Sequence, residues 1–111
     1  MAYTNTPAGW KIKKVTASGI ALGPGDIFGG VMMPTAGTST TLTAYNDQSA
    51  VAANLIIATT AALTAGQFVD STGGVIPVTS ARSPAEGLFL SGGLYLTVGG
   101  TGSPVFWVLY K

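Results

Sequence analysis

The chain has 111 residues, only nine of them charged at neutral pH, and it contains neither histidine nor cysteine. This length suits one domain with one hydrophobic core. The missing residue types exclude disulfides, thiolate or imidazole metal ligands, and any catalytic arrangement built on histidine or cysteine. A formal net charge of +1 is too small a basic footprint for a phosphate backbone, so we expect no nucleic-acid binding.

The first nine residues, Met1–Gly9, contain little apolar material and predict a flexible N-terminal arm. Such an arm is either a frayed end or a segment that orders against a neighbouring subunit. It lacks the basic start and the apolar run of a signal peptide. Residues 10–111 are expected to form the folded domain.

A first strand is predicted over Trp10–Ala17, and it carries the closely spaced lysines Lys11, Lys13 and Lys14. In a strand, Lys11 and Lys13 share one face with Val15, whereas Lys14 lies on the other. One interpretation is a solvated edge strand, whose lysines discourage pairing with other sheets. The alternative is an attachment point for an acidic surface on a partner.

Further strands are predicted at Gly19–Leu22, Ile27–Met33 and Thr40–Tyr45, which are rich in β-branched and other apolar residues. Gly29-Gly30 inside the second of these indicates a bulge or a close approach of another backbone. Pro34-Thr35-Ala36-Gly37 has the composition of a turn.

The alanine-rich segment Gln48–Ala65 allows two interpretations. A helix fits its seven alanines, but the β-branched pairs and the absence of a charged face argue against one. We favour a strand near Leu55–Thr59 followed by a loop, with the helix as the alternative.

Two strands close the chain. In Leu94–Val98 apolar and polar residues alternate, whereas Val105–Tyr110 is apolar on both faces and should be covered on both sides. Thr101–Pro104 is predicted to join them as a hairpin. With turn signals at regular intervals, the sequence predicts an all-β fold: a single antiparallel β-sandwich, jelly-roll-like or Ig-like. Turn residues also interrupt Gly87–Tyr110, the longest uncharged stretch, so we expect no membrane span.

The chain offers little for catalysis, and we predict that it is not an enzyme. Three of its four carboxylates, Asp26, Asp47 and Asp70, adjoin turn residues, where aspartate commonly bonds its own backbone. No two acidic residues lie within ten positions of each other, which is unlike a calcium loop. We therefore expect no catalytic residues, no metal and no cofactor, and a protein that works by binding a large partner surface.

An ordered series of segments resembles a known group of proteins. Thr41–Asp47 is followed by Leu55–Ala61, then by Gly87–Val98 and Val105–Lys111. The series, which covers Gly19–Lys111, is similar to small structural proteins of tailed-bacteriophage particles, in particular those that decorate the capsid exterior. The resemblance implies a sandwich that binds the assembled capsid and reinforces it.

It also implies the partner and the place: the major capsid protein, on the outside of the virion, after synthesis in the host cytoplasm. We expect a homo-oligomer on the capsid, such as a trimer at a local three-fold position. Two segments, Gln48–Ala53 and Thr79–Glu86, depart from the pattern and offer distinct contact surfaces. The expected contact residues are Trp10 with its lysine cluster and two loops: Trp10, Lys11, Lys13, Lys14, Pro34, Thr35, Arg82, Ser83 and Pro84.

Two alternative functions fit the same sequence. One is another virion component, such as a head fibre base, a neck protein or a tail protein, which copy number would distinguish from a decoration protein. The other is a carbohydrate-binding β-sandwich, for which Tyr45-Asn46-Asp47 is the candidate site because it places an aromatic ring beside amide and carboxylate groups.

Overall fold

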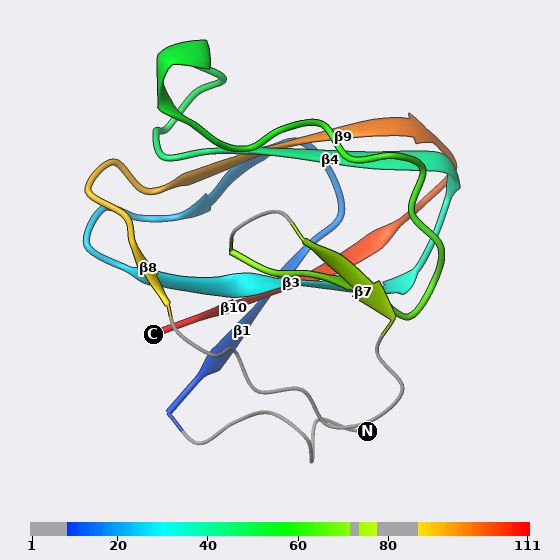
Figure 1. The fold of residues 1–111 in the computed structure, drawn as a ribbon, viewed down its shortest axis with the longest axis horizontal. Coiled ribbons are helices and arrows are strands. Elements are labelled where there is room, and N and C mark those ends of the chain that lie inside the picture. Colours follow the sequence, from blue (N-terminus) through cyan, green and yellow to red (C-terminus); the bar gives the residue numbers. More distant parts are fainter. Residues whose placement is uncertain (1–8, 72–73, 78–86) are drawn as a thin grey trace.

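The computed structural model describes residues 9–71, 74–77 and 87–111. In these residues two antiparallel sheets pack face to face (Figure 1), which confirms the predicted all-β sandwich. No helix in the described ranges has the length and apolar character to cross a membrane. Sheet A holds β1 (Lys11–Val15), β10 (Val105–Tyr110), β3 (Ile27–Thr35), β6 (Gln67–Val69) and β7 (Val75–Pro77) in this order, with β8 (Leu88–Phe89) beside β3. Sheet B holds β2 (Gly19–Leu22), β9 (Leu94–Thr101), β4 (Thr38–Tyr45) and β5 (Leu55–Ile57).

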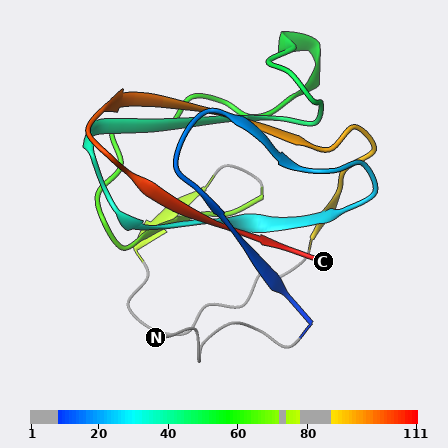
Figure 2. The same cartoon turned by 180° about the vertical axis from the view of Figure 1, so that it is seen from behind.

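The strand pairs are nested. Strand β1 pairs with β10, β2 with β9, β3 with β6 and β4 with β5, all antiparallel. The chain is thus one long antiparallel hairpin, wound up so that β3 also lies beside β10 and β4 beside β9. This winding is the jelly-roll arrangement, so the topology selects the jelly roll over the Ig-like alternative. Figure 2 shows the first and last strands crossing the back of the molecule together.

The predicted hairpin at Thr101–Pro104 is wrong. Strand β9 belongs to sheet B and β10 to sheet A, so this loop carries the chain from one sheet to the other. Both edges of β9 are already occupied, by β2 and by β4, and β10 finds its partners in β1 and β3.

The predicted turn at Pro34–Gly37 is shorter than expected. Pro34 and Thr35 are the last two residues of β3, and only Ala36 and Gly37 separate it from β4. Pro34 is accommodated because the pairing of β3 with β10 is irregular here: the register passes from Met32 to Thr35 with a shift. A proline, which lacks an N–H, fits a strand at such an irregularity.

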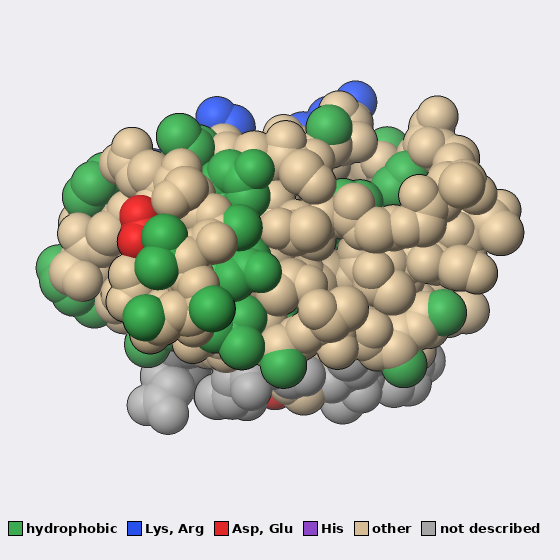
Figure 3. Space-filling view, turned by 90° about the horizontal axis from the view of Figure 1, so that it is seen from above, with side chains coloured by type: hydrophobic (Ala, Val, Ile, Leu, Met, Phe, Trp, Pro, Cys, Tyr) green, Lys and Arg blue, Asp and Glu red, His purple; other side chains and the backbone are tan. Residues whose placement is uncertain are grey.

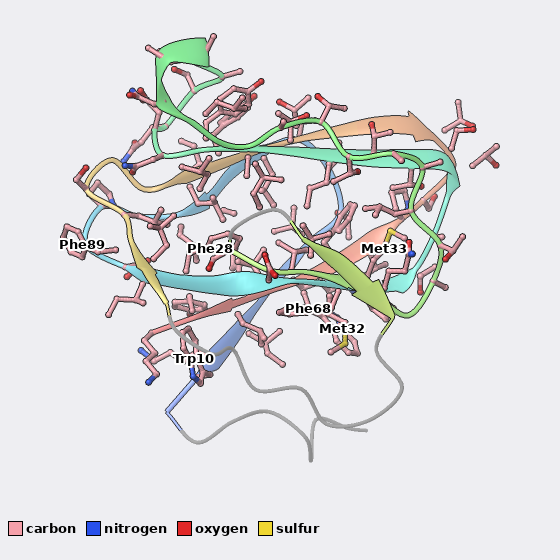
Figure 4. The ribbon with its side chains drawn as sticks, viewed as in Figure 1. Trp10, Phe28, Met32, Met33, Phe68 and Phe89 are labelled. Atoms are coloured by element: carbon pink, nitrogen blue, oxygen red, sulfur yellow. The ribbon has the colours of Figure 1, made fainter. Side chains whose placement is uncertain are left out.

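The core lies between the sheets. Phe28 and Met33 point from β3 into this space in Figure 4, and both are almost completely buried. Leu94 and Leu96 enter from sheet B, which confirms the alternation predicted for β9. The fully buried side chains, those under 2% exposed, include Phe28, Phe106, Leu42, Leu90, Leu94, Leu96, Val31 and Val108.

Both interpretations of Gly29-Gly30 are confirmed. Leu109 pairs with Gly30 and Tyr110 with Phe28, so the register shifts at Gly29 as in a β-bulge. A Cβ on Gly30 would lie 2.5 Å from Cζ of Phe68, whose ring therefore covers this glycine. Because paired residues share a face, Leu109 lies on the same outer side of sheet A, and it too is buried. The inner face of β10 is buried at Phe106 and Val108, whereas its outer face is buried at Leu109 and only partly covered at Val105 and Trp107, so cover on both faces is confirmed in part.

The alanine-rich segment forms no α-helix. A short 3₁₀ helix, η1 (Ala52–Asn54), leads into β5, which ends at Ile57, two residues earlier than predicted. Beyond it the chain still follows β4: the Thr60 N–H donates to the carbonyl of Leu42 over 3.0 Å, and the hydroxyls of Thr59 and Thr43 lie 2.7 Å apart. The strand interpretation is confirmed, with side-chain hydroxyls replacing part of the ladder.

Candidate interaction surfaces

Strand β1 lies at one edge of sheet A, and among the described strands it pairs only with β10. Its three lysines, Lys11, Lys13 and Lys14, are all exposed. Because an unpaired edge invites association with other strands, lysines there oppose uncontrolled pairing. The prediction of a solvated, lysine-bearing edge strand is confirmed.

A fourth lysine joins this edge. Nζ of Lys111 lies 4.6 Å from the ring centroid of Trp10, and Nζ of Lys11 lies 5.7 Å from that of Tyr110. Both distances fall within cation–π range. The backbone of Lys111 exchanges hydrogen bonds of 2.9 and 3.0 Å with Ile27, which continues the pairing of β10 with β3. Figure 4 shows Trp10 at the end of β1 that carries these contacts.

We call this surface the basic edge: Lys11, Lys13, Lys14 and Lys111, with the rings of Trp10 and Tyr110. It contains every lysine of the chain, and Arg82 lies outside the described residues. The contribution of Lys111 was not predicted. In the sequence, Lys111 is visible only as a basic residue at the end of an aromatic strand. Its position beside Trp10 follows from the pairing of β10 with β1.

The other expected contact residues do not join the basic edge. Thr35 pairs with Val105, whereas Lys11 pairs with Tyr110. The two positions lie five residues apart along β10, roughly 17 Å. Thr35 therefore lies at the other end of β10 from Lys11, on the side of β10 away from β1, although the partner of Lys14, Trp107, is only two residues from Val105. The third expected group, Arg82, Ser83 and Pro84, lies outside the described residues.

Three carboxylates sit in turns and bond their local backbone, as predicted. Asp26 accepts the N–H of Gly23 (3.2 Å), and Asp70 accepts that of Gly74 (2.9 Å). Asp47 accepts the N–H of Gln48 (2.6 Å) and the side-chain N–H of Asn54 (2.8 Å). Within the described ranges no three acidic residues gather as a metal site would require. These groups shape loops.

The hydrogen bond from Asn54 and the backbone bond from Gln48 hold the pKa of Asp47 below its ordinary value of 3.8. Because the folded-state pKa is depressed, ionised Asp47 stabilises the fold above its unfolded pKa, and this contribution is lost as pH falls through the folded value. We expect Asn54→Ala to raise the pKa of Asp47 towards 3.8, as read from a carboxyl NMR titration. An unchanged pKa would show that the Asn54 bond does not form in solution.

The outer face of sheet B carries an apolar band. Ile20 of β2 pairs with Tyr95 of β9, which pairs with Tyr45 of β4, which in turn pairs with Leu55 of β5. We call these four residues the apolar row. Ile20 is 57% and Leu55 45% exposed, and both tyrosines are half-buried. Figure 3 looks onto this face and shows a band of hydrophobic side chains across it, with lysine or arginine only at the margin.

The two tyrosines of the row touch, and their polar neighbours are already bonded. Their ring centroids lie 6.3 Å apart at an interplanar angle of 59°, a favourable tilted pair. The side chain of Asn46 accepts the N–H of Gly92 (2.9 Å) and donates to the hydroxyl of Ser91 (3.4 Å). Asn46 and Asp47 thus tie the ends of strands together, and the carbohydrate site suggested for Tyr45-Asn46-Asp47 stays a prediction.

Comparison of the chain with protein-family models, with curated proteins and with solved structures finds no match in any of the three. Function is therefore inferred from the fold, the distribution of charge and the exposed side chains. Two surfaces stand out in the described residues: the basic edge of sheet A and the apolar row of sheet B.

Proposed function

We propose that the protein is a capsid decoration protein, which binds the major capsid protein on the outside of an assembled phage head and stabilises the shell. The observation that carries the proposal is the basic edge: all four lysines of a sparsely charged chain lie along one edge of the jelly roll, whereas the four carboxylates are scattered through the sequence. The similarity of segments within Gly19–Lys111 to phage decoration proteins supports the same function.

The basic edge suits an acidic, solvated partner surface. Its lysines are exposed, so they keep their hydration until contact and attract opposite charge over about a Debye length. Charges of this kind mainly set the orientation and rate of association. Trp10 and Tyr110 stand among them and supply aromatic area, the type of side chain that dominates interface energies. Together they provide both steering and adhesion.

The low charge of the rest of the molecule is compatible with a protein that stays bound to a capsid. Charged residues are depleted at interface cores, because their desolvation is costly. A standard interface buries about 1,600 Å² in total, and many copies on one particle act together, so that disassembly must break many contacts at once. Reinforcement then requires no chemistry, only additive contact.

Co-sedimentation of the purified protein with undecorated capsids tests the proposal. We expect pelleting at micromolar protein that weakens between low and high salt. Because reversing two exposed charges turns attraction into repulsion, Lys13→Glu with Lys14→Glu should weaken binding by about tenfold or more. The matched control, Lys13→Arg with Lys14→Arg, keeps the charge and should bind like wild type.

The outcomes separate two errors. If no protein pellets with capsids at micromolar concentration, the decoration function is wrong. If wild type and the charge-reversed variant pellet equally, the capsid contact lies elsewhere and the basic edge is only a protected sheet edge. Quantifying copies per particle then distinguishes decoration, with hundreds, from a neck protein, with about a dozen.

A further inference from the structure

Strand pairing aligns the four residues of the apolar row on the outer face of sheet B. Its members lie directly opposite one another on four adjacent strands, and directly paired residues share a face. The neighbours in sequence point inward: Leu94, Leu96 and Ala44 are 0% exposed. With strands about 4.8 Å apart, the row runs roughly 14 Å across the sheet. No described residue buries Ile20 or Leu55, which stay 57% and 45% exposed.

The strands around the row are uncharged, but an acidic group lies beside the hydrophobic band in Figure 3. Asp47 follows Tyr45 by two residues and accepts the side-chain N–H of Asn54, the residue before Leu55. None of the strands of sheet B contains a lysine, arginine, aspartate or glutamate. The lysines belong to the opposite sheet, on β1 and at Lys111. Because the row itself carries no charge, we expect its partner to present an apolar surface at the same place.

We infer that the outer face of sheet B binds the same face of a second copy of this chain, as a two-fold dimer. The row reads aliphatic, tyrosine, tyrosine, aliphatic from either end, which is the self-complementarity that a two-fold interface requires. A two-fold axis parallel to the strands, between β9 and β4, places Ile20 against Leu55 of the other copy. The same axis places Tyr95 against the other copy's Tyr45.

The loop that contains η1 fits this arrangement. It stands above sheet B in Figure 1, and it leads directly into Leu55 at the β5 end of the row. In the two-fold dimer, the η1 loop next to β5 of one copy lies beside β2 of the other copy. Val51, which is 38% exposed, and the exposed alanines Ala52 and Ala53 then add apolar contact.

The size of the face sets the strength of the dimer. Strands β9 and β4 have eight residues each, whereas β2 has four and β5 three. At about 3.4 Å per residue and about 4.8 Å per strand, they give a footprint of roughly 375 Å² per copy, or about 750 Å² in total before the η1 loop is added. This is below the roughly 1,000 Å² of a stable specific interface, so we expect a weak, transient dimer with a dissociation constant in the upper micromolar range. The inference does not rest on the proposed function, since the basic edge lies in sheet A and stays free in both copies.

Sedimentation velocity over a concentration series tests the dimer. We expect wild type to pass from monomer to dimer in the upper micromolar range. Ile20→Lys and Leu55→Lys should each raise the dissociation constant by about tenfold or more, because each buries a charge against an apolar side chain. Phe89→Lys is the matched control: Phe89 is the most exposed of the large hydrophobic residues at 63%, lies in sheet A, and should leave the dimer unchanged.

A charge pair tests the orientation. In a mixture of Ile20→Lys with Leu55→Glu, the predicted axis sets the new lysine of one copy against the new glutamate of the other and leaves the second contact native. The mixture should therefore dimerise more tightly than either variant alone.

Three results would overturn the inference: a wild type that stays monomeric at about 1 mM, Phe89→Lys that dissociates the dimer, or row variants that dimerise like wild type. A monomeric wild type that binds a glycan array, with binding lost in Tyr95→Ala, would assign the row to carbohydrate instead.

Discussion

Replacing Phe28 by alanine is expected to lower the free energy of unfolding by about 4 kcal/mol, a large part of the 5–15 kcal/mol that holds a typical domain together. The Phe28 ring is 0% exposed and points from β3 into the space between the sheets. Its removal forfeits both the transfer of the ring out of water and the packing contacts around the cavity. Urea denaturation, compared at equal slope, measures the loss.

Phe89 supplies the matched control for the same deletion. It lies on β8, next to the residue that pairs with Phe28, yet its ring is 63% exposed. Phe89→Ala should change the free energy of unfolding by about 0.5 kcal/mol or less, the usual range for surface substitutions. Equal losses for the two variants would contradict the placement of the core.

Gly30→Ala is expected to cost about 3 kcal/mol through two additive effects. Gly30 has φ +122°, where an L-residue is strained. A Cβ there would also lie 2.8 Å from the carbonyl oxygen of Val69 and 2.5 Å from Cζ of Phe68. The ring can shift, but the carbonyl belongs to β6, which is paired with β3. The expected measurement is a lower midpoint of thermal or urea unfolding.

Gly25→Ala separates strain from collision. Gly25 has φ +92°, but a Cβ on it would meet nothing within 4 Å. The substitution should therefore cost only the backbone strain, about 1–2 kcal/mol. If Gly30→Ala is no worse than Gly25→Ala, the close approach of β6 to β3 is not present in solution.

Much of the fold could be predicted because local patterns report local environments. Alternation in Leu94–Val98 predicted which side chains enter the core, since successive residues of a strand face opposite sides. Gly29-Gly30 predicted a bulge or a close approach, because glycine weakens a strand and is usually found inside one where a bulge forms or another group comes close to the backbone. The three lysines of β1 predicted a sheet edge for a similar reason.

What could not be predicted depends on pairing between distant strands. The sequence of the short loop at Thr101–Pro104 is compatible both with a hairpin and with a connection between the two sheets. The connection forms because β2 and β4 occupy both edges of β9, which leaves no edge for β10. The apolar row likewise exists only because three separate strand registers place one residue from each of four strands side by side. The position of Lys111 beside Trp10 follows from the pairing of β1 with β10.

The nested pairing has a consequence in time. The strand β1 pairs only with β10 among the described strands, so a ribosome that adds 5–20 residues per second makes β10 roughly 5 to 20 s after β1. Until β10 is made, the edge of β3 that pairs with it in the folded protein has no partner. Pairing over such sequence distances also makes folding slow once the chain is complete. During synthesis β1 remains without its partner strand β10 for longer than the strands that pair at shorter sequence distances. The lysines of β1 oppose association of this strand with other chains in that interval, when a sparsely charged chain is most exposed to aggregation.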